Sequence, residues 1–331
     1  MKNPILTPSL RAAASAALLT VSILWPAAAR AQGSSASALP ALSVATVGAS
    51  RAEAESLKRA RAAVQAKALG TAESDAAVAI ALDVGRNDAF TIPGVDLAMV
   101  VIRPGEFAMG SANGDADEKP VTQVKLTQPY WLGKYEVTQG QWTAVMGTTP
   151  KRQRDKVNPQ WPMSGKGANQ PMYYVSYDEA LAFCRKLTER ERSAGRLPEG
   201  YVYTLPTEAQ WEYACRAGTT GDYAGDLGSM AWYKYNSDYT THVVGQKQSN
   251  AWGLHDMHGN VWEWCRDWYA DKLPGGTVID PVGAASGSVR VLRGGSWWYS
   301  APSCRSAYRG RCGPGGRNDL LGFRLALSAV R

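Results

Sequence analysis

The segment 253–265 concentrates the residues of this chain that could do chemistry. It reads GLHDMHGNVWEWC and holds two carboxylates, Asp256 and Glu263, seven residues apart. Gly259 lies between them, and a glycine allows the backbone to turn sharply. A loop bent at this glycine could direct both carboxylates and the intervening carbonyl oxygens at one hard cation such as calcium, which prefers oxygen ligands. The alternative is a tight structural turn followed by a strand whose two indoles face the core.

Cysteine, histidine and arginine side chains offer further chemistry in the C-terminal half. The five cysteines are Cys184, Cys215, Cys265, Cys304 and Cys312. No CxxC spacing occurs, so a zinc site is not expected, whereas an oxidising compartment would pair some of them. His255 and His258 lie inside the glycine-rich segment, where structural hydrogen bonding is the favoured interpretation. An arginine cluster at 305–324 could brace loops or bind an anionic or peptide partner.

The first residues are typical of a secretory signal peptide. Lys2 and Arg11 precede a short apolar run that ends at Pro26, and Ala29-Arg30-Ala31 is an Ala-x-Ala cleavage site. We therefore expect residues 1–31 to be removed near Ala31 and the mature protein to be periplasmic or secreted. No other apolar run approaches the length of a membrane span.

The composition indicates a loop-rich globular protein. The chain has 331 residues, a formal net charge of +7, 33 glycines and 12 tryptophans against 4 phenylalanines. The charge is moderate, and no basic run with interleaved aromatics occurs, so nucleic acid is not an expected partner. The oligomeric state is not evident from these features.

Three domain-level segments follow from the patterns along the chain. After the signal peptide, residues 32–94 read as a linker with an Ala/Glu/Arg-rich helical segment. The main domain is expected at 95–331. Leu97–Ile102 and residues 107–111, separated by a turn, predict a β-hairpin that opens it.

Three helices should begin with a capping box, in which a hydroxyl and a Glu or Gln three residues later satisfy free amides. The pairs are Thr138 with Gln141, Ser176 with Glu179, and Thr207 with Gln210. Strands are expected at Val121 to Leu126, Tyr130 to Val137, Val289 to Arg293 and Leu321 to Leu327. A few helices among short strands and long loops predict an α+β fold with small antiparallel sheets.

Five motifs in order resemble the formylglycine-generating enzyme family, also called the sulfatase-modifying factor domain. They are YEVT at 135–138, LPTEAQWEYA at 205–214, GLHDMHGNVWEW at 253–264, RGGSW at 293–297 and GFR at 322–324. The resemblance covers roughly residues 95–331. It implies an irregular, loop-rich, C-type-lectin-like fold that binds calcium.

The resemblance fails at the position of the family's chemistry. Family enzymes hold copper with two cysteines, the first three residues after the Gly-Gly-Ser serine and the second five residues further on. Here the second position is Cys304, but the first is Tyr299. Two soft thiolates suit Cu(I), and a tyrosine does not replace one. Copper is therefore not expected, and the chain is interpreted as a member that lacks the first catalytic cysteine.

The calcium loop carries over better. The family binds the ion through a side-chain oxygen, two carbonyls and a glutamate, and the matching positions here are Asp256, Gly259, Val261 and Glu263. The family also implies a candidate disulfide between Cys215 and Cys304. The alternatives are a buried free thiol at Cys304 or Cys312 as its partner.

The resemblance leaves two functional hypotheses. The first is an exported protein- or ligand-binding or accessory factor, whose expected partner is an unidentified protein or peptide of the cell envelope. Residues 297–319 also resemble the variable region of diversity-generating retroelement proteins, which bind targets with this fold. The expected binding surface is Trp298, Tyr299, Ser300, Arg305, Tyr308, Arg309 and Arg311. The second hypothesis is an oxidoreductase or a protein or siderophore maturation factor with a different active site, for which Cys304 and Tyr299 are the candidates.

Overall fold

The computed structural model describes residues 89–197 and 199–329. The expected signal peptide at 1–31 and the helical segment within 32–94 lie outside the described residues. The described residues begin with a strand at Ala89 that pairs within a sheet. Within the described residues, no helix is long and apolar enough to cross a membrane.

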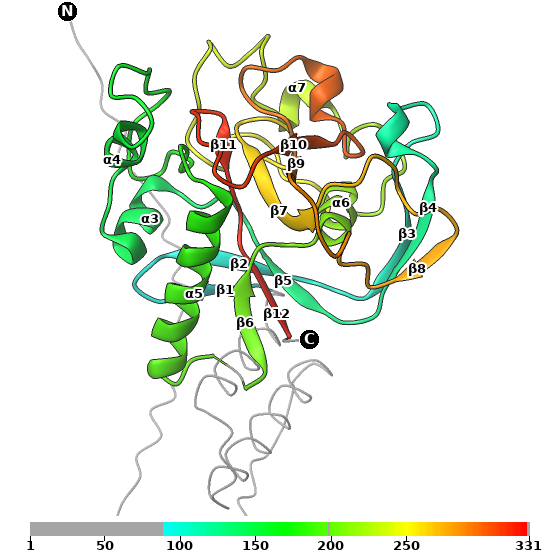
Figure 1. Cartoon of the computed structure of the whole chain (residues 1–331), viewed down its shortest axis with the longest axis horizontal. Helices are drawn as coiled ribbons and strands as arrows, with labels where there is room; N and C mark the ends of the chain where they lie inside the picture. The colour runs from blue at the N-terminus through cyan, green and yellow to red at the C-terminus, as the bar shows by residue number, and fades with distance from the viewer. Residues whose placement is uncertain (1–88, 198, 330–331) are drawn as a thin grey trace, which may run out of the picture. The chain divides into compact units, whose positions relative to one another are not determined.

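A five-stranded antiparallel sheet joins the two ends of the domain (Figure 1). Its strands in spatial order are β1 (Ala89–Ile92), β2 (Leu97–Ile102), β5 (Tyr130–Gly133), β12 (Ala326–Ala329) and β6 (Tyr201–Thr204). The closing strand β12 inserts between β5 and β6, where Ala326 is paired with both Leu132 and Thr204. The last strand of the chain is therefore an interior strand of the sheet.

The predicted hairpin of residues 97–111 is wrong. Strand β2 pairs with β1 and β5, whereas β3 (Gly105–Met109) belongs to a second sheet with β4 (Thr122–Leu126) and β8 (Thr277–Ile279). The turn at Arg103 and Pro104 thus carries the chain from one sheet to another. The β4 strand pairs in parallel with β8, which differs from the expected antiparallel sheets.

The third sheet contains the last four residues of the segment 253–265, which begin β7 (Trp262–Trp268). Its order is β10 (Gly310–Cys312), β9 (Arg290–Arg293), β7 and β11 (Leu321–Gly322), with β11 parallel to β7. The buried residues form two hydrophobic clusters. Trp262 and Trp264 of β7 both belong to one cluster, and Cys265, the next residue along the strand, belongs to the other. The period-two alternation predicted for this strand is confirmed.

All three capping boxes form as predicted. They begin α3 (Gln139–Met146), α5 (Tyr177–Ser193) and α6 (Glu208–Arg216), and in each box both hydrogen bonds are present. The sequence did not predict the short α4 (Pro150–Asp155) and α7 (Leu227–Met230), or the 3-10 turns η1 (Ala116–Glu118) and η2 (Ala301–Cys304). The predicted closing strand 321–327 is split into β11 and β12.

The architecture is α+β with few helices and several small sheets, as expected. Helix α5 packs Phe183 against Trp142 of α3 and Phe323, with ring centroids 5.8 and 5.3 Å apart. Stacked and edge-on aromatic pairs add to the stabilisation from burial. The regular elements hold the long loops between α6, β7, β9 and β11, and these loops carry the candidate site.

Candidate functional site

An exposed group of aromatic side chains forms where two loops meet. The turn after β9 buries Trp297 but leaves Trp298 51% and Tyr299 39% exposed. The loop 233–239 contributes Tyr235, 73% exposed, and Tyr239, 56% exposed. We call Tyr235, Tyr239, Trp298 and Tyr299 the aromatic surface.

Contacts between the two loops hold the aromatic surface together. The Tyr239 and Trp298 rings lie 5.5 Å apart at 62°. The Lys234 amide donates to the Tyr299 carbonyl at 3.0 Å, and the Ser237 hydroxyl donates to the Trp297 carbonyl at 2.8 Å. Residues 233–239 were missed by the sequence reasoning, although the density of tyrosines in that stretch could have indicated them.

The structure places the residues of the expected binding surface in different environments. Trp298 and Tyr299 are exposed, and Ser300 is half-buried beside them. Tyr308 packs its ring against Trp262 at 5.9 Å. Arg311 is exposed but donates to the Tyr269 hydroxyl at 2.6 Å.

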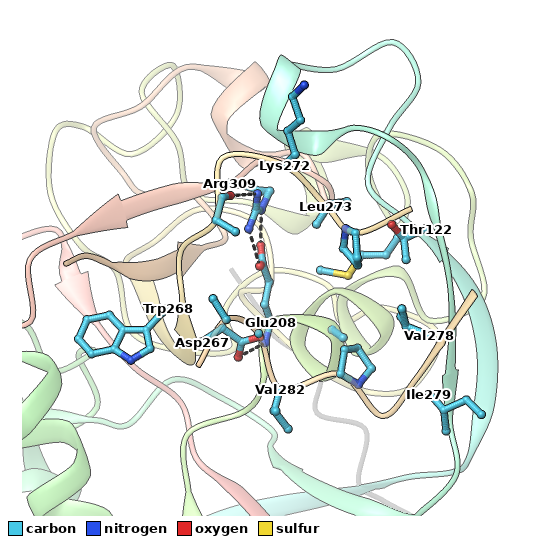
Figure 2. Close-up of a pocket in the computed structure, with 17 residues that line it drawn as sticks. Thr122, Glu208, Asp267, Trp268, Lys272, Leu273, Val278, Ile279, Val282 and Arg309 are labelled. Carbon is cyan, nitrogen blue, oxygen red and sulfur yellow. Dashed lines mark hydrogen bonds and ion pairs between the residues drawn. The ribbon is translucent and has the colours of Figure 1, made fainter. Parts of the chain in front are cut away.

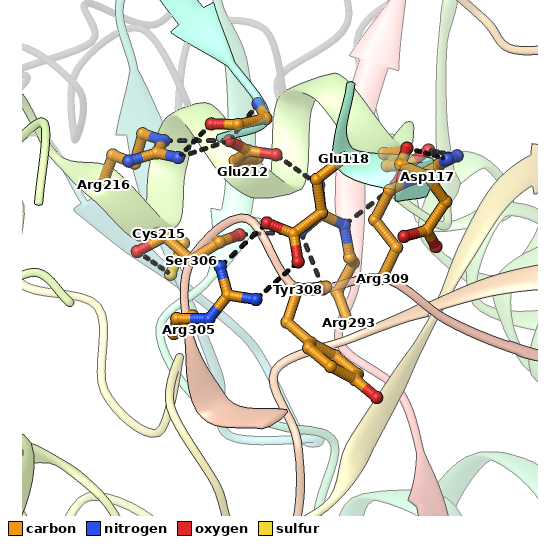
Figure 3. A network of polar contacts seen from close by, with 12 residues as sticks. Asp117, Glu118, Glu212, Cys215, Arg216, Arg293, Arg305, Ser306, Tyr308 and Arg309 are labelled. Atoms are coloured by element: carbon orange, nitrogen blue, oxygen red, sulfur yellow. Dashed lines mark hydrogen bonds and ion pairs between the residues drawn. The ribbon is translucent and has the colours of Figure 1, made fainter. Parts of the chain in front are cut away.

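Arg309 does not belong to a surface, which corrects that part of the prediction. Its side chain is buried and forms a two-bond ion pair with Glu208, at 2.6 and 2.8 Å. Arg305 is similarly held by Glu118 at 2.5 and 2.8 Å (Figure 3). These two arginines therefore brace loops, which was the structural alternative for the cluster.

The arginines are part of a buried charge network that fixes α6. Arg293 bonds to Glu208 and Glu212 of this helix, and Arg216 bonds to Glu212 at 2.8 Å. Burial alone would raise the pKa of Glu208, but Arg293 and Arg309 lower it. Each carboxylate of the network is paired with at least one guanidinium, so the network has little charge to offer a ligand.

Cys304 is a buried thiol rather than an exposed ligand. It is fully buried at the end of η2, and burial raises its pKa to about 12. Tyr299, five residues earlier, instead presents its ring to solvent and packs edge-on to Trp262 at 5.5 Å. A neutral buried thiol is a poor nucleophile and a poor metal ligand.

Cys215 and Cys304 share one imidazole as a neighbour. His258 donates from Nδ1 to the Cys304 carbonyl at 2.7 Å, and its Nε2 accepts from the Ala224 amide at 3.1 Å. The Cys215 sulfur lies 3.8 Å from Nε2, and burial lowers the pKa of His258 to about 4. The structure contains all five cysteines as free thiols, and the Cys215–Cys304 disulfide stays a prediction.

The predicted calcium positions lie in a tight, buried turn. Gly259 has φ +87°, and a Cβ there would lie 2.1 Å from the Trp232 carbonyl oxygen. Asp256 accepts from the Gly245 amide at 2.7 Å through Oδ2, while its buried Oδ1 has no hydrogen-bond partner among the described residues. This unpartnered oxygen fits a cation ligand.

The carboxylate of Glu263, the other acidic residue of the predicted calcium site, already has partners within the protein. Both of its oxygens bind Arg324, at 2.7 and 2.6 Å, and Oε2 also accepts from the Trp211 indole at 2.7 Å. It fits a cation site only if it is shared with Arg324.

The sequence reasoning missed Glu136, although it lies within the YEVT motif. Its oxygens accept from the Asn260 side chain at 2.7 Å and the Val261 amide at 3.0 Å. Burial first, and then the charges of Asp256 and Glu263, raise its pKa, and burial raises the pKa of Asp256 to about 6. Three buried carboxylates thus surround the single guanidinium of Arg324, an excess of negative charge that would suit a cation.

A separate acidic cluster could hold a metal ion. Asp115, Asp117 and Glu118 place one carboxylate oxygen each within 4.8 Å of one another. However, Glu118 binds Arg305, and Asp117 accepts from the Tyr269 hydroxyl at 2.5 Å. The sequence reasoning did not identify this cluster.

Comparison with known proteins agrees with this architecture. The sulfatase-modifying factor enzyme 1-like domain family matches residues 92–329. Variable protein 1 of Treponema denticola superposes with a TM-score of 0.62 at 33% identity, covering 72% of this chain and 97% of that one. The formylglycine-generating enzyme of Streptomyces coelicolor is 28% identical over 68% of this chain and 87% of its own length.

A serine/threonine-protein kinase, pkn1 of Chlamydia pneumoniae, is 31% identical over 69% of this chain. The match spans only 37% of the kinase's length. The family match covers nearly all of the described residues, from the last residue of β1 through β12. The chain therefore belongs to the sulfatase-modifying factor enzyme 1-like domain family.

Proposed function

We propose that this chain is a binding or accessory protein of its family and acts through the aromatic surface. The observation that carries the proposal is the exposure of Trp298, Tyr299, Tyr235 and Tyr239 on two loops that are tied together. Rigid aromatic side chains supply large contact area at low entropic cost and dominate protein interfaces. The proposed partner is a protein or peptide of the cell envelope.

The surroundings of Cys304 support a role other than copper-dependent oxidation. Tyr299 stands where the resemblance places the first copper ligand, and its ring packs on Trp262. Cys304 is buried, with a raised pKa. The competing function, an oxidoreductase or maturation factor, would need a reactive group at Cys304 or Tyr299 that substrate can reach.

Calcium is proposed as a structural ion at the glycine-rich turn. Asp256 would supply its free oxygen, the Gly259 and Val261 carbonyls would be further ligands, and Glu263 would be shared with Arg324. The excess of buried carboxylates around Arg324 supports this proposal.

Export completes the proposal. Residues 1–31 would direct the chain out of the cytoplasm, with removal near Ala31. Mass spectrometry of the chain recovered from an envelope fraction would give the mature N-terminus, and an intact Met1 there would contradict it.

The test is affinity capture from an envelope fraction with matched variants. Trp298→Ala should lose the captured partner because it removes an exposed indole that contacts Tyr239 in the aromatic surface, whereas Trp161→Ala should retain it. Trp161 is a suitable control because it is also exposed, at 41%, and lies in another loop. Equal capture by both variants would contradict the proposal.

A further inference from the structure

A cavity lies beside β8, in a part of the domain separate from the aromatic surface. It has a volume of about 600 Å³ and shares no lining residue with the aromatic surface. Its walls are mostly apolar side chains from the loops and strands around α6, as Figure 2 shows. They are Met109, Ala209, Leu273, Val278, Pro281 and Val282. This volume lies within the range of small-molecule sites, which is about 300–1,000 Å³.

The cavity also contains a small polar group at the start of α6. Glu208 lines it, but Arg293 and Arg309 bind both carboxylate oxygens. The Arg309 guanidinium also donates to the carbonyls of Asp117 and Ala270, both at 2.8 Å. These two charged side chains are therefore paired within the protein.

Asp267 is the exception among the polar groups of the cavity. It is only 4% exposed and lines the cavity, and Oδ2 accepts from the Glu208 amide at 2.9 Å. No described residue donates to Oδ1. Lys272 also lines the cavity, but its amine points away from Asp267 (Figure 2). The cavity thus presents one unpaired carboxylate oxygen among apolar walls.

The negative charge of the Asp267 carboxylate favours a cationic ligand. A carboxylate buried in apolar surroundings without a partner cation is costly, so an incoming cation that forms a charge-assisted hydrogen bond would be favoured. Burial, followed by the charge of Glu208, raises the pKa of Asp267 to about 7, and the Glu208 amide and the charges of Arg266 and Arg309 oppose this rise without cancelling it. An ammonium group would offset both effects, whereas an incoming carboxylate would add a third negative charge beside Glu208.

We propose that this cavity binds a small amphipathic amine, whose ammonium pairs with Asp267 while its apolar body fills the space between β8 and α6. The amine could be a free molecule or the lysine side chain of a peptide. Both present an ammonium on an apolar stem, and the binding experiment separates them.

Isothermal titration calorimetry on the full chain tests the proposal, with 2-phenylethylamine as the probe and 2-phenylethanol and 3-phenylpropionate as its neutral and anionic counterparts. The amine should bind at least about tenfold more tightly than either counterpart. N-acetyl-lysine methylamide serves as the peptide arm. Tighter binding of that compound assigns a lysine side chain, and tighter binding of 2-phenylethylamine assigns a free amine.

The variants make the result specific to Asp267. Asp267→Asn keeps an oxygen that can accept from the Glu208 amide but removes the charge, and it should lower amine affinity at least about tenfold. Asp271→Asn is the matched control, because Asp271 is exposed in the following loop and does not line the cavity. Val282→Trp, at an exposed rim position, should block binding without touching the buried network.

The pH dependence gives a second readout. Amine affinity of the unaltered chain should rise about tenfold between pH 6 and 8 as Asp267 loses its proton, and it should be flat in Asp267→Asn. Equal affinity for amine and alcohol, or an unchanged affinity in Asp267→Asn, would overturn the proposal.

Discussion

Replacing Arg324 by glutamine should destabilise the fold more than any single surface change. The guanidinium is fully buried and binds both oxygens of Glu263, as well as the carbonyls of Gly133 and His255 at 2.9 and 3.0 Å. Its removal leaves Glu263 beside Glu136 and Asp256, three buried carboxylates with no cation from the network.

Breaking a buried ion pair by removing one partner costs about 3–5 kcal/mol. For a domain of this size, such a loss corresponds to a fall in Tm of roughly 6–20 °C. Chemical denaturation in EDTA at pH 7 measures the change in the free energy of unfolding. The control is Lys125→Gln, which breaks the exposed pair of Lys125 with Glu106 and should cost at most about 1 kcal/mol.

The pH dependence of stability tests whether the three buried carboxylates cause the loss in Arg324→Gln. The folded state binds protons at Glu136 and Asp256 more tightly than the unfolded chain, because both pKa values are raised. Protonation of these two carboxyls therefore adds stability as pH falls through this range, and the Arg324→Gln variant should recover part of its loss relative to the parent chain between pH 7 and 5. A loss below about 1 kcal/mol, or one that does not respond to pH, would refute the reasoning.

Three further predictions concern the surrounding groups. The buried neutral His258 has its pKa lowered to about 4, so its contribution to stability should fall by up to about 3 kcal/mol as pH drops from 6.5 to 4. Urea midpoints of the parent chain and His258→Asn check this, and equal pH slopes would contradict it. In iodoacetamide labelling at pH 8, the half-buried Cys312 should react before the fully buried Cys304, whereas equal rates would contradict the burial argument. Mass spectrometry without reduction would show the predicted disulfide as the loss of two hydrogens. Calcium should raise the Tm relative to EDTA, and Asp256→Asn should abolish this rise while Asp115→Asn retains it; the reverse pattern would place the ion at the acidic cluster.

The sequence predicted those parts of the fold that depend on local rules. The three capping boxes formed because a hydroxyl and a Glu or Gln three residues later interact within one helical turn. The alternation of Trp262 and Trp264 was also predictable, because a strand has period two whatever its partner. The few helices among short strands and long loops predicted the α+β class, and the family motifs implied its irregular, C-type-lectin-like form.

Strand partners and burial of charged groups could not be predicted from local patterns. The expected hairpin failed because β3 turns away to β4, and its sequence does not encode which sheet it joins. Arg309 and Arg311 are only two residues apart, yet Arg309 is buried against Glu208, 101 positions earlier, and Arg311 is exposed. Only the tertiary fold distinguishes them.

The candidate site shows the same division. Trp298 and Tyr299 were expected at the surface and are exposed, whereas Tyr235 and Tyr239 join them only through contacts between loops. Glu136 was visible in a motif, but its place beside Asp256 and Glu263 depends on how distant loops close over it.

The most direct test of the proposed function is a Cu(I) titration of the purified chain, followed by incubation with a cysteine-containing peptide and oxygen. We predict no tight stoichiometric copper and no peptide aldehyde beyond the level of a Cys304→Ala variant, because Tyr299 does not replace a thiolate and Cys304 is buried. One tightly bound Cu(I) together with conversion of the peptide thiol to an aldehyde would contradict the account.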